Sequence, residues 1–568
     1  MIYSEQDHRL AKPVTARIDS FFPRNRSVLQ ELEDRFPGHN PAIIRCFSLA
    51  CHLGATAYVE ETIAPEGMIA LENEDLERAG YWHGDMVLRF SFWRVTGNAA
   101  ISVDAIDSSC CLGYALIKCD GENSEAPRFY VFEAVFNESR LTYTPSVSEG
   151  EYDFRVLNRV FRVRGTLYCQ QNGLTKVCSQ VALRSLLSRL MPGHDISYRR
   201  IEDLAKEVSE GKAREKIGLT TTLTEKIIKR LGFTVDYMGM SIKTSESEYL
   251  RYLHLIYAGV ESGAGSFMAF GPKGIASEPD KLHVIPVYGQ SFNDHNWVAG
   301  ASSIYFDESK MKSSVSSDAW LGSFVGHDDN CGPCLMIPRH YLHAGKLAWG
   351  AVLRRPHANF SSASAKKRAW LILCNCANRF FGRSENAWAR QIRAIIGGRC
   401  GNGGKYVHKI VLRVSLVDRF DYLKHIALAE DWDGNMEDEG VIADLSNMLP
   451  EKIWLGEFSV VPLFSGFKRV LGEVVLDAAT TPDTDKFSGE YDIDYSSSNI
   501  FENFCFLRFP SAIITRESLK ASSEAQLKES NIQSHVSCYE PFHDKTSFHV
   551  VEIKEPGFCT DDSAKAGA

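Results

Sequence analysis

The sequence predicts a multidomain protein of the α+β class. The chain has 568 residues, more than one hydrophobic core accommodates, so we expect about two to four domains. Stretches in which apolar and polar residues alternate predict strands, and stretches in which apolar residues recur every three or four positions predict helices. Stretches of both kinds occur in the first two thirds of the chain, and strand-like stretches also occur in the last third.

We expect three domains and a tail. Residues 1–155 form an N-terminal α/β accessory domain, and residues 156–345 form the domain with the candidate chemistry. Residues 346–530 form a C-terminal α+β accessory domain. The end of the chain from about Glu517 is rich in Ser, Lys, Glu and Asp, and residues 531–568 are predicted to be a flexible tail.

Local patterns predict the main elements of these domains. Helices are expected where the apolar period is close to 3.6 residues, and strands where it is two. The predicted helices lie at 42–50, 178–190, 201–208, 226–231 and 248–260. The predicted strands lie at 86–95, 128–135, 233–237, 265–270, 282–289, 409–417 and 472–477. A capping box at 222–225 is expected to open the helix at 226–231.

The most informative stretch is 168–183. A polar loop with two consecutive glutamines, the second of them Gln171, leads to Cys178 and an apolar helical pattern. Cys178 is therefore expected near the N-terminus of a helix, where unpaired N–H groups and the helix dipole favour the thiolate. An upstream glutamine can place an amide N–H where the oxyanion of an acyl-transfer reaction forms. A competing interpretation makes Cys178 a small buried core residue, as free cysteines often are.

Two later segments carry residues that suit a cysteine site. The apolar segment 282–289 has His283 near its start, and the apolar segment 320–330 ends in an acidic turn with Asp328 and Asp329. A cysteine at a helix start, then a histidine and an aspartate on later strands, predicts a cleft between a helical half and a sheet half. The helical half would supply the nucleophile and the sheet half the base.

This order resembles the papain-like cysteine peptidase superfamily. Within it, the region is most similar to the peptidases that cleave double-glycine leaders from bacteriocin precursors. The similarity rests on Gln171 ahead of a cysteine that opens a helix, on the segment from His283 to Tyr288-Gly289, and on the spacing from Asp328 to Gly332. It covers about a third of the chain. It implies a central papain-like domain made of a helical half and an antiparallel-sheet half.

The resemblance also implies a role for each site residue. Cys178 would attack a peptide-type carbonyl, and His283 would take the thiol proton and later protonate the leaving amine. Asp328 would orient His283, and Gln171 with the backbone N–H of Cys178 would hold the oxyanion. No cofactor and no metal is expected.

Two assignments within this site stay open. His295 competes with His283 for the role of base, because it lies among polar residues in the loop 291–297. Asp329 competes with Asp328, because a shift of one residue at the end of a strand exchanges which side chain points inward.

Three functions are compatible with these residues. The first is a cysteine peptidase or isopeptidase with a protein or peptide substrate, whose flanking domains select that substrate or bind a regulatory protein partner. The second is a thiol acyl-transfer enzyme of the transglutaminase or deamidase type, which differs only in what attacks the acyl-enzyme. The third is a non-catalytic interaction protein. It stays open because Gln171 lies seven residues before Cys178, where the resembled family usually has six, and because the gap from His283 to Asp328 is long.

Composition predicts a cytoplasmic protein without nucleic-acid or membrane partners. The net charge is -9 and the chain has no long basic run, which argues against general nucleic-acid binding. No apolar stretch is long enough to span a bilayer, and the first residues lack the basic and apolar regions of a secretory signal. The 15 cysteines follow no repeating spacing, which is not typical of a disulfide framework.

Three further motifs receive structural interpretations. Cys331-Gly332-Pro333-Cys334 has the Cys-x-x-Cys form of redox proteins, but it follows an acidic turn and lacks further zinc ligands at suitable spacing. The glycine-rich segment 397–404 lacks the Lys-Ser/Thr ending of a phosphate loop. The acidic segment 430–439 lacks the spacing of a calcium loop and is expected to be solvated.

Overall fold

The computed structural model describes the chain in two compact units. Unit 1 comprises Met1–Ser245, Gly263–Ser291 and Ser323–Pro356, and unit 2 comprises Glu246–Ser262, Phe292–Gly322 and His357–Ala568. The domain division expected at residues 155, 345 and 530 stays a prediction. The described residues are 8–20, 28–38, 40–95, 107–137, 150–174, 178–191, 195–209, 219–240, 245–271, 282–292, 314–342, 347–354, 361–379, 381, 387–397, 409–431, 434–467, 469–480, 501–510, 512–516 and 542.

Unit 1 begins with an antiparallel sheet of order β1-β2-β4-β5-β3, in which β6 also pairs with β5. Its strands are β1 (Pro13–Ser20), β2 (Ala57–Ile63), β3 (Trp82–His83), β4 (Val87–Trp93), β5 (Cys111–Gly121) and β6 (Arg128–Phe136). Its helices are α1 (Val28–Arg35), α2 (Pro41–His52) and α3 (Gly67–Arg78), preceded by the 3-10 turn η1 (His8–Leu10). The predicted strands at 86–95 and 128–135 and the helix at 42–50 are confirmed as β4, β6 and α2.

Two apolar layers cover the faces of this first sheet. On one face, Phe47 of α2 packs edge-on against Phe90 and Phe92 of β4. The other face is covered by a hairpin of β7 (Gly150–Val156) and β8 (Arg159–Gly165), whose Phe154 stacks on Tyr114. Alternate residues of each strand thus serve opposite faces, as the period of two requires.

A second sheet and three helices complete unit 1. The sheet has the order β14-β13-β11-β10-β15-β9. Its strands are β9 (Thr234–Gly239), β10 (Gly265–Phe270), β11 (His283–Phe292), β13 (Leu321–Asp328), β14 (Gly332–Pro338) and β15 (Leu347–Arg354). The helices are α4 (Cys178–Leu190), α5 (Tyr198–Val208) and α6 (Thr221–Arg230). Their apolar faces share one core with β10, β11 and β15, so these helices lie on one face of the sheet.

One predicted helix start in unit 1 is wrong in detail. The expected capping box at 222–225 lies inside α6. The N-cap is Thr220, whose hydroxyl accepts a hydrogen bond from the backbone N–H of Leu223. Three threonines stand in a row here, and local spacing does not distinguish which of them ends the preceding loop.

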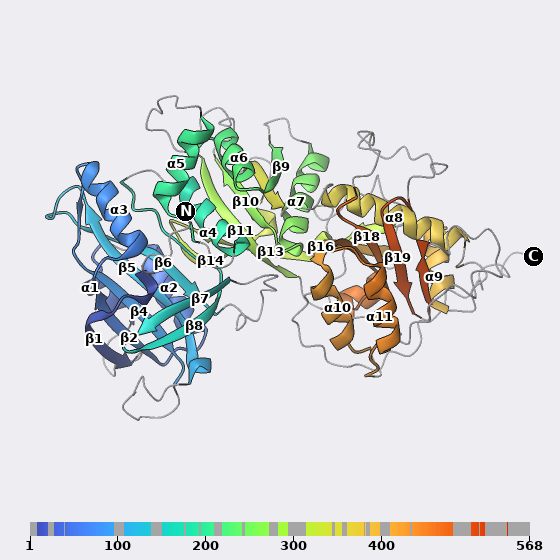
Figure 1. The fold of residues 1–568 in the computed structure, drawn as a ribbon, viewed down its shortest axis with the longest axis horizontal. Coiled ribbons are helices and arrows are strands. Elements are labelled where there is room, and N and C mark those ends of the chain that lie inside the picture. The colour runs from blue at the N-terminus through green and yellow to red at the C-terminus, as the bar shows by residue number, and fades with distance from the viewer. Residues whose placement is uncertain are drawn as a thin grey trace, which may run out of the picture. The chain divides into compact units, whose positions relative to one another are not determined.

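Unit 2 is a sheet of order β12-β16-β17-β18-β19-β20 with helices on both faces (Figure 1). The strands are β12 (Ser314–Ser316), β16 (Ile410–Asp418), β17 (Lys452–Val460), β18 (Gly472–Asp477), β19 (Phe504–Phe509) and β20 (Ala512–Thr515). The helices are α7 (Glu246–Glu261), α8 (Ser362–Arg379), α9 (Ala387–Ile396), α10 (Arg419–Leu428), α11 (Glu439–Met448) and α12 (Val461–Phe467). Trp454 packs with α8 and α9, and its neighbour Leu455 packs with α10 and α11.

The acidic segment 430–439 departs from the expectation of a solvated loop. Asp431 and Glu437 are both buried. Glu437 accepts a hydrogen bond of 3.0 Å from Arg508, and Asp431 accepts one of 2.8 Å from the backbone N–H of Asn435. The prediction is wrong for these two carboxylates: Glu437 is buried against the distant Arg508, whereas Asp431 is bound within the segment itself.

The described elements confirm the α+β class, since helices accompany sheets that are largely antiparallel. Of the predicted tail 531–568, only Phe542 lies within the described residues, and of the glycine-rich segment 397–404, only Gly397 does. Among the helices that the structure describes, none combines the length and the apolarity needed to cross a membrane.

Candidate active site

Cys178 is the first residue of α4, as the sequence predicts. The helix is buried from Gln180 to Leu190, and Leu186 lies against Gly265 at the start of β10. Upstream, Tyr168 forms a backbone bridge with Ala134 of β6. The segment that carries the candidate nucleophile is therefore held by both sheets of unit 1.

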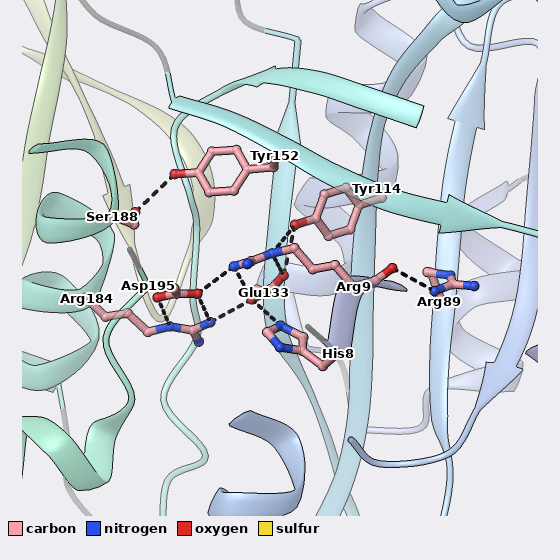
Figure 2. A network of polar contacts seen from close by, with 9 residues as sticks. All are labelled: His8, Arg9, Arg89, Tyr114, Glu133, Tyr152, Arg184, Ser188 and Asp195. Atoms are coloured by element: carbon pink, nitrogen blue, oxygen red, sulfur yellow. Dashed lines mark hydrogen bonds and ion pairs between the residues drawn. The ribbon is translucent and has the colours of Figure 1, made fainter. Parts of the chain in front are cut away.

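A buried ionic network fixes α4 further (Figure 2). Glu133 of β6 accepts hydrogen bonds of 2.7 Å from Arg9 and 2.7 Å from Arg184 of α4. Asp195 bridges the same two guanidinium groups at 2.6 and 2.9 Å. Burial alone raises the pKa of Glu133, but Arg9, His8 and Arg184 outweigh burial and hold that pKa well below its usual range. The helix that begins at Cys178 is thereby tied to η1 and β6.

His283 and Asp328 meet on neighbouring strands. His283 is the first residue of β11 and Asp328 the last of β13. Nε2 of His283 lies 3.2 Å from Oδ1 of Asp328, and the two side chains are 29% and 13% exposed. The same Asp328 oxygen accepts N–H groups from Asn330 at 2.8 Å and Cys331 at 3.1 Å. The structure thus brings together the two residues that the sequence assigned as base and orienting group.

The charges of this pair support each other. Burial lowers the pKa of His283, but Asp328 and then Asp329 outweigh burial, so the net pKa lies above its ordinary value. Burial raises the pKa of Asp328, but His283 and two backbone N–H groups outweigh burial and lower it. Both shifts favour an ion pair of protonated imidazole and carboxylate.

Asp329 lies on the other ring nitrogen of His283. Its Oδ1 is 3.5 Å from Nδ1, and its side chain is only 4% exposed. Within the described residues, neither of its carboxylate oxygens has a hydrogen-bond partner. Burial raises the pKa of Asp329 to about 6; His283 opposes this rise, and the carboxylate of Asp328 adds to it. Both candidate aspartates therefore contact His283: Asp328 at Nε2 and Asp329 at Nδ1.

The Cys178 thiol lies beside the start of β11. The hydroxyl of Ser179 lies 3.9 Å from its sulfur, and the backbone N–H of Val284, the residue after His283, acts to lower the pKa of the thiol. Burial raises the pKa of Cys178 and the charge of Asp329 adds to the rise, whereas Ser179 and Val284 oppose it. The balance lies opposite to the expectation from the helix N-terminus alone, so this thiol needs a base.

Not every predicted site residue joins this group. Across the described part of unit 1, no hydrogen bond links Cys178 to His283 or to Gln171. Gln171 is partly buried in the loop before α4. The side chain of the preceding Gln170 instead accepts the N–H of Val131 at 2.9 Å. His295, the alternative base, lies outside the described residues.

A buried histidine that the sequence did not single out supports the acidic turn. His327 precedes Asp328, and its Nδ1 accepts the backbone N–H of Cys334 at 3.2 Å, while Nε2 lies 3.2 Å from the carbonyl oxygen of Thr166. Burial lowers the pKa of His327 to about 3, so the ring is neutral and Nε2 donates to that carbonyl. The hydroxyl of Tyr288 lies 3.3 Å from the Cys334 sulfur. Cys331 and Cys334 are free thiols. Cys334 packs against Tyr288 and His327.

No protein-family model matches the sequence, and no curated protein matches it.

Proposed function

We propose that this protein is a cysteine peptidase or isopeptidase of papain-like fold that hydrolyses a peptide-type bond in a protein or peptide substrate. The contact of 3.2 Å between His283 and Asp328 carries the proposal. The position of Cys178 at the start of α4, beside the residue that follows His283, supports it. The arrangement of α4 against β10, with His283 on the adjacent β11, suits a helical half that faces a sheet half.

In the first half-reaction, His283 takes the thiol proton of Cys178. Asp328 lies 3.2 Å from Nε2 and Asp329 lies 3.5 Å from Nδ1; we assign the orienting contact to Asp328 and the role of base to Nδ1, whose contact is the longer one. The sulfur attacks the substrate carbonyl carbon and forms a C–S bond, and the carbonyl oxygen becomes an oxyanion. When the intermediate collapses, the C–N bond breaks and His283 returns the proton to the leaving amine. The product is a thioester on Cys178.

In the second half-reaction, water replaces the amine. His283 takes a proton from water, the hydroxide attacks the thioester, and the C–S bond breaks. The proton returns to the sulfur, and the carboxylic acid product leaves. We assign the oxyanion contacts to the backbone N–H of Cys178 and to the amide of Gln171.

The cellular setting is part of the proposal. All twelve cysteines within the described residues are free thiols, which supports a reducing compartment and hence a cytoplasmic location. The substrate is a protein or peptide, a regulatory protein partner can bind the flanking regions, and nucleic acid and membrane are not partners.

The proposal is tested by covalent capture with a pool of peptide vinyl sulfones of mixed side chains, followed by mass spectrometry of the labelled peptides. We expect an adduct on Cys178 that Cys178→Ala abolishes and His283→Ala reduces more than about tenfold. Cys331→Ser is the matched control, because Cys331 is exposed and lies in the same turn as Asp328. The proposal is contradicted if the probe labels the exposed thiols generally and if His283→Ala leaves the labelling unchanged.

A further inference from the structure

The proposed peptidase chemistry uses Cys178, His283 and Asp328 but gives Asp329 no role. A carboxylate with 4% exposure and without a hydrogen-bond partner among the described residues is costly unless something compensates it. It is directed at His283, with Oδ1 at 3.5 Å from Nδ1. The position of Asp329 therefore needs an explanation of its own.

The geometry of the three side chains matches a metal-ion site. One ligand atom each from His283, Asp328 and Asp329 can be chosen so that all three lie within 4.8 Å of one another. Bonds of about 2.0–2.1 Å to a tetrahedral ion place two ligand atoms about 3.3 Å apart. Oδ1 of Asp329 lies 3.5 Å from Nδ1 of His283, close to that separation, whereas Asp328 contacts the other ring nitrogen, Nε2, at 3.2 Å. An ion on Nδ1 therefore requires the Asp328 carboxylate to move toward that nitrogen, from a ligand separation of at most 4.8 Å.

The surroundings hold the ligands as a metal site requires. Two backbone N–H groups, from Asn330 and Cys331, fix the Asp328 carboxylate, which is the function of an outer shell. His327, the residue before the two aspartates, stabilises their turn, because its ring accepts a hydrogen bond from the backbone N–H of Cys334. Asp329 is buried and contacts His283 at 3.5 Å, but within the described residues its carboxylate oxygens accept no hydrogen bond, so a cation would satisfy them.

The ligand types select the class of ion. One imidazole and two carboxylates suit Zn²⁺ and its neighbours in the first transition row. Mg²⁺ and Ca²⁺ prefer sites made of oxygen ligands only. Three protein ligands leave a further position for water or another ligand.

We propose that His283, Asp328 and Asp329 bind one divalent ion of the zinc class, and that this ion silences the Cys178 thiol. The silencing rests on the proposed function, since Nδ1 of His283, the nitrogen proposed as the base, cannot accept the thiol proton while it is bonded to the ion. Asp329 is then the residue that adds metal control to the site. Removal of the ion returns the imidazole to its role as base.

Binding is tested first, without any reference to activity. Full-length protein, reduced and freed of metal, is titrated with Zn²⁺ against a chromogenic chelator. We expect one tight site per chain, which Asp329→Asn and His283→Ala each weaken more than about tenfold. The surface variant Asp153→Asn is the matched control and keeps the affinity of the unaltered protein, and Cys331→Ser, which retains the backbone N–H to Asp328, tests whether a thiol is a ligand. The proposed site is contradicted if Cys331→Ser abolishes zinc binding, or if Asp329→Asn leaves the zinc affinity unchanged.

A spectrum of the unaltered protein identifies the ligands without any substitution, so it does not depend on whether the variants fold. Co²⁺ in place of Zn²⁺ gives visible bands whose intensity reports tetrahedral coordination, and a thiolate ligand adds a charge-transfer band in the near ultraviolet. We expect the visible bands without strong charge transfer. Strong charge transfer indicates binding by cysteine thiolates and overturns the assignment.

Silencing is tested by the alkylation rate of Cys178 with and without one equivalent of Zn²⁺. We expect the ion to slow alkylation more than about tenfold in the unaltered protein and not in Asp329→Asn. Zinc that binds without slowing alkylation overturns the regulatory part. If Cys178 fails to react even in metal-free protein, the proposed peptidase function fails, and the titration alone still decides the metal site.

Discussion

Nε2 of His283 lies 3.2 Å from Oδ1 of Asp328, although the two residues are 45 positions apart in the sequence. Their meeting depends on β11 and β13 being neighbours in the second sheet. It also depends on the acidic turn, in which two backbone N–H groups hold the Asp328 carboxylate. A perturbation of either feature is expected to separate the pair without touching its side chains.

Gly326→Ala is such a perturbation. A Cβ at this position of β13 would lie 2.5 Å from the carbonyl oxygen of Pro286 on β11, so the two strands must move apart. We expect the variant to lower the free energy of unfolding by about 1–3 kcal/mol and to slow Cys178 alkylation, because Asp328 follows two residues later. Urea unfolding and alkylation rates measure both effects.

Gly239→Ala provides the comparison for that experiment. Its Cβ would meet only the tip of the Tyr237 ring at 3.2 Å, and Tyr237 is half exposed, so it can move. This variant should keep both the stability and the alkylation rate. Equal effects of the two alanines would show that the close approach of β13 to β11 does not position the site.

Glu133→Gln is predicted to destabilise unit 1 strongly. The carboxylate is fully buried and neutralises Arg9 and Arg184. Its replacement leaves buried positive charge without full compensation, at a cost of about 3–5 kcal/mol in the free energy of unfolding. Urea denaturation measures the loss. Glu151→Gln removes an exposed partner of Arg162 and Arg164 and should change stability by less than about 1 kcal/mol; similar losses for both variants would contradict the role of burial.

In unit 2, the variant Glu457→Gln is predicted to be more stable than the unaltered protein at high pH but not at low pH. Burial raises the pKa of Glu457 to about 8, although the ion pair with Arg413 opposes the rise. Between pH 4.5, the ordinary value, and pH 8, the unfolded chain releases a proton that the folded chain keeps. The free energy of unfolding therefore falls as the pH rises through this window.

Glutamine does not titrate, so the variant should match the unaltered protein near pH 5. At pH 8 it should be more stable by an amount on the order of a few kcal/mol. Thermal unfolding at the two pH values, with both proteins in the same buffers, gives the comparison. A difference that does not depend on pH would contradict the raised pKa of Glu457.

Periodicity predicted the elements that local sequence determines. The alternation at 86–95 and 128–135 marks β4 and β6 within a few residues. The helix that opens at Cys178 begins there because the apolar period starts at that residue and the preceding loop is polar. His283 and Asp328 followed from their places at a strand start and a strand end.

The ionic partners could not be predicted in this way, because they come from distant segments. Glu133 interrupts the apolar run of β6, which signals a buried charge, but nothing in the sequence says that its partners are Arg9 and Arg184. The same holds for Glu437 and Arg508. His327 was missed because it reads as one polar residue in an acidic turn, and only the fold brings Cys334 and Thr166 to its two nitrogens.

The most direct test of the central claim is the rate at which iodoacetamide alkylates Cys178 in metal-free protein near neutral pH. The rate is compared among the unaltered protein, His283→Ala and Asp328→Asn, with the labelled site read by mass spectrometry. We predict that Cys178 reacts faster than the exposed Cys331 despite its burial, and that each variant slows it more than about tenfold. A Cys178 that reacts no faster than Cys331, and at the same rate in both variants, would contradict a thiol activated by His283 and Asp328.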